Sequence, residues 1–141
     1  MVTIRVATLD DAARLYTWQQ PSGSFAAFCK QLALQDDEHR IYVARDQARS
    51  TWVGMATLQR HGNEMDVTVL VDPGQRGKGY AAAVLDLVLD EARALNVTRV
   101  TATPADDDHA AIRALWSAGF RHASGQANLL MMNLTTGVEH R

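Results

Sequence analysis

The stretch from Val67 to Ala81 constrains the fold of this chain more than any other. It reads VTVLVDPGQRGKGYA: an apolar run typical of a strand, a proline turn, and a glycine-rich basic loop that opens into a long amphipathic pattern. Gly77 and Gly79 have no side chain, so a ligand can approach their backbone closely. The first N–H groups of a helix lack intrahelical partners and lie at the positive end of its dipole. This order of elements therefore predicts a phosphate-binding site, to which Arg76 and Lys78 add positive charge.

Two known glycine loops fit this stretch poorly. The P-loop of nucleotide triphosphatases requires Gly-Lys followed by Ser or Thr, whereas Gly79 follows Lys78 here. Residues 77–82 match the loose dinucleotide pattern G-x-G-x-x-G/A, but residues 72–76 separate the first glycine from its strand. The residues after Ala82 are also too few for the rest of a dinucleotide-binding domain. The hypothesis of a dinucleotide-dependent oxidoreductase therefore rests on the loose glycine match alone.

A third pattern fits better. Residues 76–81 read as R/Q-x-x-G-x-G/A, and residues 108–120, DHAAIRALWSAGF, read as a helix that ends at a Gly-Phe pair entering a strand. Both segments, and the strand and turn at 69–73, resemble the GCN5-related N-acetyltransferase (GNAT) superfamily. The resemblance covers nearly the whole chain. It implies an α/β fold with a mixed, mostly antiparallel central sheet, a splayed parallel strand pair and about four flanking helices.

Composition agrees with one domain. A chain of 141 residues can bury a sizeable core, and we expect the domain to span 1–134 and the tail 135–141 to fray. The formal net charge of −2 gives no electrostatic basis for nucleic-acid binding. No apolar run reaches the roughly 20 residues of a membrane span, and no signal peptide is recognisable, so we expect a soluble, cytoplasmic protein. Cys29, the only cysteine, is predicted to be a buried small hydrophobe.

Hydrophobic periodicity predicts the order of elements. A first helix should carry Ala12, Leu15 and Tyr16 and be capped by Asp10 or Asp11. The other predicted helices are 25–34, 79–95 with Asn96 as its C-cap, and one that is capped within 106–108 and ends at Gly119. The predicted strands are 3–7, 40–45, 51–59, one beginning near Glu64 after a turn at 61–63, 99–103, 120–122 and 128–133.

The resemblance implies acetyl-CoA as cosubstrate. Leu70 and Val71 would meet the pantetheine arm and the thioester, since a gap between splayed strands leaves backbone groups unpaired. The pyrophosphate would be held by the loop amides of Arg76, Gly77, Lys78, Gly79, Tyr80 and Ala81. We expect Tyr80 to be helix packing or a lid over the cofactor rather than a catalytic acid. No metal is expected, because His39, His61, His109 and His122 are scattered and do not pair at a metal-ligand spacing.

The proton-handling groups depart from the family pattern. Many members have a tyrosine five residues before the Phe of the Gly-Phe pair, and that position is Leu115 here. Members often carry a Glu or His on the strand before the loop, at positions that correspond to Met65 or Val67. Asp66 and Glu64 flank these positions and are our candidate bases, provided that a bulge turns one of them to the required face. A chain of waters is the alternative. In the family, the last helix often begins with asparagine; this chain has Asp108 at that position.

The resemblance implies an N-acetyltransferase that transfers the acetyl group directly to a primary amine in a ternary complex. We expect a small-molecule acceptor rather than a protein, with acidic runs at 36–38 and 106–108 that could attract a cationic one. The missing acid and base favour an alternative: a catalytically impaired CoA-binding sensor or interaction domain. The family commonly forms homodimers, and an exposed strand edge near 128–133 is where a second copy could pair.

Overall fold

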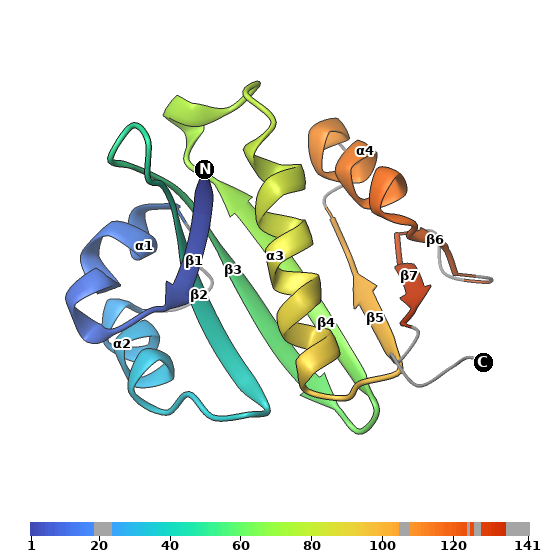
Figure 1. Cartoon of the computed structure of the whole chain (residues 1–141). Coiled ribbons are helices and arrows are strands. Elements are labelled where there is room, and N and C mark those ends of the chain that lie inside the picture. Colours follow the sequence, from blue (N-terminus) through green and yellow to red (C-terminus); the bar gives the residue numbers. More distant parts are fainter. Residues whose placement is uncertain (19–23, 105–107, 124, 126–127, 135–141) are drawn as a thin grey trace.

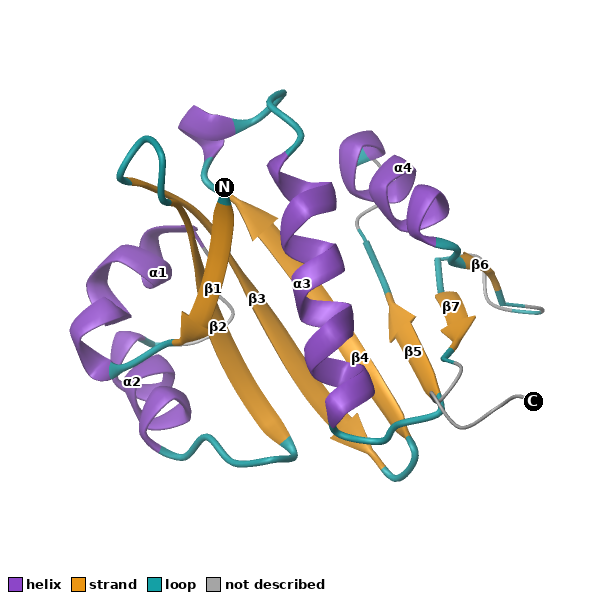
Figure 2. Ribbon diagram, in the orientation of Figure 1, coloured by secondary structure: helices purple, strands orange, loops and turns teal. Residues whose placement is uncertain are grey.

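The computed structural model describes residues 1–18, 24–104, 108–123, 125 and 128–134. The expected tail 135–141 and the carboxylates of Asp106 and Asp107 lie outside these residues. Within them, seven strands form one sheet in the order β1-β2-β3-β4-β5-β7-β6 (Figures 1 and 2). Their bounds are β1 Val2–Val6, β2 His39–Asp46, β3 Thr51–His61, β4 Glu64–Val71, β5 Arg99–Ala102, β6 Arg121–His122 and β7 Leu130–Asn133.

Every neighbouring pair of strands is antiparallel except β4 and β5, which run parallel. A parallel pair needs a long crossover, and here helix α3 supplies it. The turn at 61–63 joins β3 to β4, as predicted. The mixed, mostly antiparallel sheet confirms the expected fold class.

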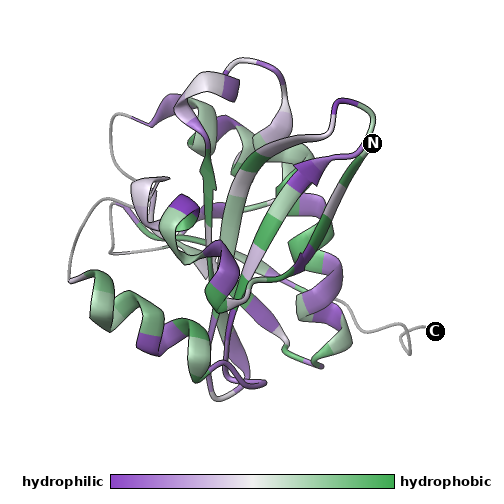
Figure 3. Ribbon diagram, turned by 90° about the vertical axis from the view of Figure 1, so that its left-hand side faces the viewer, coloured by the Kyte–Doolittle hydropathy of each residue, from purple (hydrophilic) through white to green (hydrophobic). Residues whose placement is uncertain are grey.

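Helices cover both faces of the sheet (Figure 3). Their bounds are α1 Ala12–Trp18, α2 Phe25–Ala33, α3 Tyr80–Ala94 and α4 His109–Ala118, with short 3-10 turns at η1 Leu9–Asp11 and η2 Pro73–Gln75. Side chains alternate along each strand, so β2 sends Tyr42 and Ala44 into the cluster under α3 and α4, and Ile41 and Val43 into the cluster under α1 and α2. The sheet therefore separates two hydrophobic cores.

The helix ends follow the predicted signals with two changes, at the end of α3 and at the start of the first helix. Asp108 caps α4 by accepting the N–H of Ala111 at 3.1 Å, and Gly119 ends that helix with φ at 114°. Asn96, just beyond the C-cap Leu95 of α3, has a φ of 62°, which suits an asparagine at a helix end. At the first helix neither Asp10 nor Asp11 is the N-cap residue; that position is Thr8.

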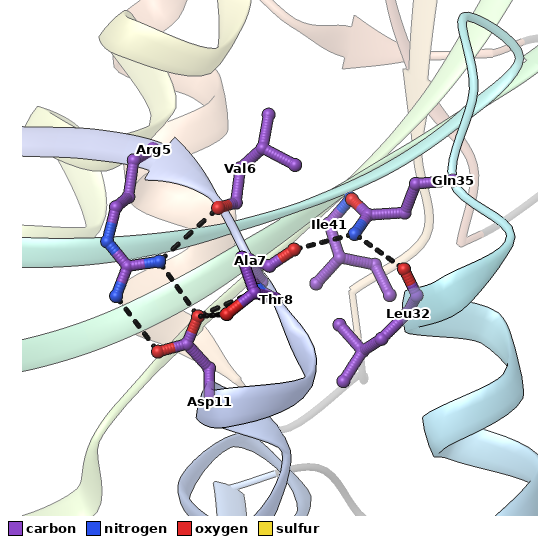
Figure 4. A network of polar contacts seen from close by, with 8 residues as sticks. All are labelled: Arg5, Val6, Ala7, Thr8, Asp11, Leu32, Gln35 and Ile41. Carbon is purple, nitrogen blue, oxygen red and sulfur yellow. Dashed lines mark hydrogen bonds and ion pairs between the residues drawn. The ribbon is translucent and has the colours of Figure 1, made fainter.

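A polar network holds α1 and α2 to the sheet (Figure 4). Asp11 accepts the Thr8 N–H at 2.8 Å and two bonds from the Arg5 guanidinium, at 2.8 and 2.9 Å. Gln35, after α2, donates to the carbonyls of Ala7 and Leu32 and accepts the N–H of Ile41. Asp11 is buried, and the Arg5 hydrogen bonds are the main reason that its pKa is lowered.

Two expectations need correction. The expected sheet edge near 128–133 is only partly open, because β6 pairs with Leu130 and Met131 of β7 and, among the described residues, leaves Met132 and Asn133 without a partner on that side; β1 and β6 are the edge strands. Cys29 is only partly buried, at the border of the cluster under α1 and α2. No helix among the described residues is long and apolar enough to cross a membrane.

Candidate functional site

The site begins where β4 and β5 part. Their pairing links Glu64 with Arg99, Met65 with Val100, and Asp66 with Thr101, and within the described residues it goes no further. Strand β4 continues to Val71, so its last five residues, Val67 to Val71, lack a partner on the β5 side. Backbone groups without a strand partner remain available to a ligand that enters the gap.

Two adjoining pockets fill this gap and form a cleft. One, of about 430 Å³, runs from β4 past the glycine loop to α4, and the other, of about 590 Å³, reaches through to Trp18 at the end of α1. Both are lined by Val69, Leu70, Arg76, Ala81, Asp108, Ala111 and Ala114. The cleft thus connects the α3–α4 face of the sheet with the α1 face. A long, narrow ligand could extend through it from one face to the other.

The glycine loop at one end of the cleft has the backbone shape expected of an anion cradle. Gly77 and Gly79 have φ of +80° and +81°, and a Cβ at either position would meet nothing within 4 Å. Gly79 is the N-cap of α3, so the first N–H groups of that helix have no intrahelical partner and remain available to a ligand. Asp72 fixes the entry to the loop by accepting the N–H of Gly74 at 3.0 Å.

Most of the cofactor residues predicted from the sequence line this cleft: Leu70, Val71, Arg76, Gly77, Gly79, Tyr80 and Ala81. Lys78 does not; its ammonium group donates to the side chain of Gln75 at 3.0 Å. The backbone at Leu70 and Val71 is held on its other side by β3, where Gly54 pairs with Val71. A Cβ on Gly54 would come within 2.3 Å of the Leu70 carbonyl oxygen, so only glycine allows this close approach.

The hydroxyl of Tyr80 is engaged in hydrogen bonds with the β2–β3 hairpin. It donates to Asp46 at 2.7 Å and accepts from Arg49 at 3.3 Å, and the residue is buried. The bond from Tyr80 is the main cause of the lowered pKa of Asp46. Tyr80 therefore ties the start of α3 to the β2–β3 hairpin, and its backbone N–H is what remains for a ligand. The sequence did not reveal Asp46 as its partner, because the contact joins residues far apart in the chain.

The opposite wall of the cleft comes from α4. This helix presents small side chains at helical spacing, Ala110, Ala111, Ala114 and Ser117, which leaves room beside α3. Arg113 also lines this wall, and the sequence analysis did not single it out. Its position on the same helical face as Ala110 and Ser117 was the available signal. Asp108 lies in the cleft, but its carboxylate is engaged in capping α4.

The carboxylates proposed from the sequence lie on the α1 face of β4. The register between β3 and β4 is regular from Gly54–Val71 to His61–Glu64, so the bulge considered above is absent from this pair. Asp66 and Glu64 consequently point opposite to the buried Met65 and Val67. Neither carboxylate lines the cleft, and the nearest cleft residue on their face is Thr68.

Asp66 and Glu64 have different surroundings. Asp66 is partly buried and accepts a hydrogen bond from the Thr101 hydroxyl at 3.0 Å. Burial raises its pKa, while the Thr101 bond and the charge of His61 act in the opposite direction. Glu64 instead pairs with Arg99 at 3.0 Å, and both side chains of that pair are more than 40% exposed. Its raised pKa makes Asp66 a candidate for proton exchange.

Leu115 lines the cleft at the position where the family pattern has tyrosine. It is 7% exposed, and the cleft around it also contains Thr68, Thr103 and Pro104. Leucine cannot donate a proton, so the general acid usual in the family is missing at this point. Among the described residues, no group of three or more His, Cys, Asp or Glu side chains could hold a metal ion.

The model of the acetyltransferase (GNAT) family matches residues 5–120. No curated protein sequence matches the chain. Solved structures with the same fold include spermidine N-acetyltransferase from Vibrio cholerae in complex with CoA and spermine, at 16% identity and a TM-score of 0.80, covering 94% of this chain and 95% of that one. An aminoglycoside acetyltransferase in complex with coenzyme A has 20% identity and a TM-score of 0.75 over 94% and 95% of the two chains. A dodecameric form of the Vibrio cholerae enzyme has 17% identity and a TM-score of 0.76 over 94% and 93%.

Proposed function

Because the chain belongs to the acetyltransferase (GNAT) family, we propose that it transfers the acetyl group of acetyl-CoA directly to a primary amine of a small-molecule acceptor. The observation that carries this proposal is the separation of β4 from β5 after Asp66 and Thr101, with a cleft that runs from the glycine loop to the α1 face. Two structures of the same fold contain coenzyme A, which supports the choice of cosubstrate.

The residues of the cleft fit acetyl-CoA in three ways. The loop amides from Arg76 to Ala81 would bind the pyrophosphate at the N-terminus of α3, with the Arg76 side chain adding charge. The free edge of β4 at Leu70 and Val71 would bind the amides of the pantetheine arm. The alanines of α3 and α4 leave the width that a thin chain needs.

The chemistry requires one proton to leave the acceptor. The amine nitrogen attacks the thioester carbonyl, a C–N bond forms, the C–S bond breaks, and the sulfur departs as thiolate. We assign the removal of the amine proton to Asp66, acting through water, because it lies on the acceptor side of β4, two residues before the cleft residue Thr68. Its raised pKa makes it a stronger base than an ordinary aspartate.

The acceptor reaches the thioester from the α1 face, where Trp18 and Thr68 line the cleft. A pocket of about 590 Å³ has the size of a small-molecule site. Structures of the same fold include enzymes named for spermidine and for aminoglycosides, which are small amines. One of these enzymes is a dodecamer, and we propose that this chain also self-associates; light scattering of the purified protein tests this.

The first experiment is calorimetric titration with acetyl-CoA, with NAD and ATP as controls, followed by thiol release on adding a panel of amines. Selective binding of acetyl-CoA with amine-dependent thiol release is the expected result. A preference for NAD would favour an oxidoreductase and contradict the proposal.

The second candidate function is a CoA-binding sensor, and Leu115 in place of the expected tyrosine is the observation that favours it. Tight binding of acetyl-CoA without thiol release for any amine in the panel would be its signature.

A further inference from the structure

A cluster of cations surrounds one tryptophan on the α1 face of the sheet. The guanidinium carbons of Arg5, Arg14 and Arg45 lie 5.2, 5.2 and 5.4 Å from the centroid of the Trp52 ring. They come from different elements, β1, α1 and β2, so their meeting is a product of the fold. Each contact is a favourable cation–π interaction, but three like charges around one ring also repel one another.

Of these three charges, the nearby carboxylate of Asp11 neutralises only that of Arg5. Asp11 forms two hydrogen bonds with Arg5. Among the described residues, no hydrogen bond or ion pair reaches the guanidinium group of Arg14 or of Arg45, and the Nε atom of Arg45 is buried without a hydrogen-bond partner. A buried guanidinium donor that has lost its water and gained no acceptor costs free energy. Such an arrangement is typical of a site that an anion completes.

The cluster is adjacent to the acceptor side of the cleft. Arg14 precedes Trp18 by four residues on α1, so the two side chains are neighbours on one helical face, and Trp18 lines the cleft. Trp52, Trp18 and the cleft residue Leu70 also pack against the same hydrophobic cluster, under α1 and α2. A ligand bound at Arg14 would therefore extend along α1 toward the mouth of the cleft.

We propose that Arg14 and Arg45, supported by Trp52, bind a carboxylate of the acceptor. The acceptor is then an amine that also carries a carboxylate, as in an amino acid or a short peptide, with its amine directed to the cleft at Trp18 and Leu70. This inference rests on the proposed acetyl transfer and specifies its substrate class. A guanidinium offers two parallel N–H groups that match the two oxygens of a carboxylate. A ligand ammonium or a neutral ligand group has no such pair of acceptor oxygens.

The test compares amines that differ only by a carboxylate. Thiol release is measured with lysine against 1,5-diaminopentane, phenylalanine against 2-phenylethylamine, and methionine against 3-(methylthio)propylamine. The wild type should show a kcat/KM at least about tenfold higher for the carboxylated member of an accepted pair, mainly through KM. Arg45→Met and Arg14→Met should reduce that ratio toward one, whereas Arg93→Met, which changes an exposed arginine on α3, should leave it unchanged.

Equal rates with both members of the accepted pairs would overturn the inference while leaving acetyl transfer intact. A second measurement does not depend on transfer. Sodium glutarate should raise the melting temperature of the wild type more than sodium chloride of equal ionic strength, and Arg45→Met should abolish that difference. Without any added dicarboxylate, Arg45→Met should melt no lower than the wild type, because it removes a buried, unpartnered donor. An equal response to both salts, or a large loss of stability in Arg45→Met, would assign the cluster a structural role.

Discussion

The hydroxyl of Thr101 donates a hydrogen bond to Asp66 at 3.0 Å, from β5 to β4, at the last pair before these strands separate. The bond fixes the orientation of a carboxylate that is otherwise partly withdrawn from solvent. It also lowers the pKa of Asp66, against the stronger effect of burial, which raises it. The Thr101–Asp66 pair therefore lies where the cleft opens and also affects the basicity of Asp66, the proposed proton acceptor.

Asp66→Asn should reduce kcat about 10²-fold or more, because an amide cannot accept the proton of the amine. In the wild type kcat/KM should fall as the pH drops through the raised pKa of Asp66, since only the ionised carboxylate is a base. Thr101→Val removes a bond that lowers this pKa and should therefore move the acid limb of the pH profile to higher pH. A pH profile of thiol release in all three proteins tests both effects.

Glu64→Gln is the matched control for Asp66. Glu64 lies on the same face of the same strand, but it is exposed and paired with Arg99. The Glu64→Gln variant should retain most of the activity and the wild-type pH profile. Loss of activity in Glu64→Gln with a fully active Asp66→Asn would reverse the assignment.

Gly79→Glu should abolish acetyl-CoA binding, because it places a carboxylate where the pyrophosphate would lie. Gly62→Glu is its control: Gly62 also has a positive φ, +65°, and open space around its Cβ position, but it lies in the β3–β4 turn. Both variants incur a similar backbone penalty of about 1–2 kcal/mol, so calorimetry isolates the effect of charge at the loop. Normal binding by Gly79→Glu would show that the loop does not hold the phosphates.

The sequence predicted well those features that are encoded locally. The path from β4 through the glycine loop into α3 follows from periodicity and from glycines at positions that need a positive φ. The position of Leu115 in the cleft likewise follows from its spacing to the Gly-Phe pair.

What the sequence did not predict are contacts between distant segments. The bond between Tyr80 and Asp46 joins the start of α3 to the end of β2, and the arginines around Trp52 come from separate elements. Each of these side chains, taken alone, reads as an ordinary surface or core residue. The bulge considered for β4 was wrong for a similar reason, because strand register is set by pairing with β3 and not by the local sequence.

Gly54→Ala should destabilise the fold by about 1–3 kcal/mol, because its Cβ would overlap the backbone carbonyl of Leu70 and force β3 and β4 apart. The displaced strand is the one proposed to bind pantetheine, so acetyl-CoA affinity should fall as well. Urea unfolding and calorimetry measure the two effects. Gly74→Ala, whose Cβ would make only an ordinary contact at 3.7 Å, should change stability far less.

Asp11→Asn should cost about 1.5–3 kcal/mol at neutral pH, toward the lower end because Arg5 is half exposed. The pKa of Asp11 is lowered in the folded protein, chiefly by Arg5, so its stabilisation is complete above the ordinary value of about 3.9 and is lost as the pH falls through the folded value. Urea unfolding should therefore show a constant difference from the wild type at neutral pH that shrinks in strong acid. A difference that does not depend on pH would mean that the charge of Asp11 is not the source. Asp90→Asn, in an exposed pair with Arg93, should have little effect at any pH.

Leu115→Tyr tests how the thiolate leaves. Leu115 is buried in the cleft wall at the position of the family's usual acid, so a tyrosine hydroxyl there would be placed to protonate the departing sulfur. If that departure limits turnover, Leu115→Tyr should raise kcat, up to about 10²-fold, with little change in the KM for acetyl-CoA. The phenylalanine of Leu115→Phe fills nearly the same volume as a tyrosine but has no hydroxyl, so this variant should not raise kcat. The comparison separates proton donation from packing. Equal rates in the wild type and both variants would mean that another step limits the reaction, and a gain shared by Phe and Tyr would point to the shape of the cleft instead of an acid.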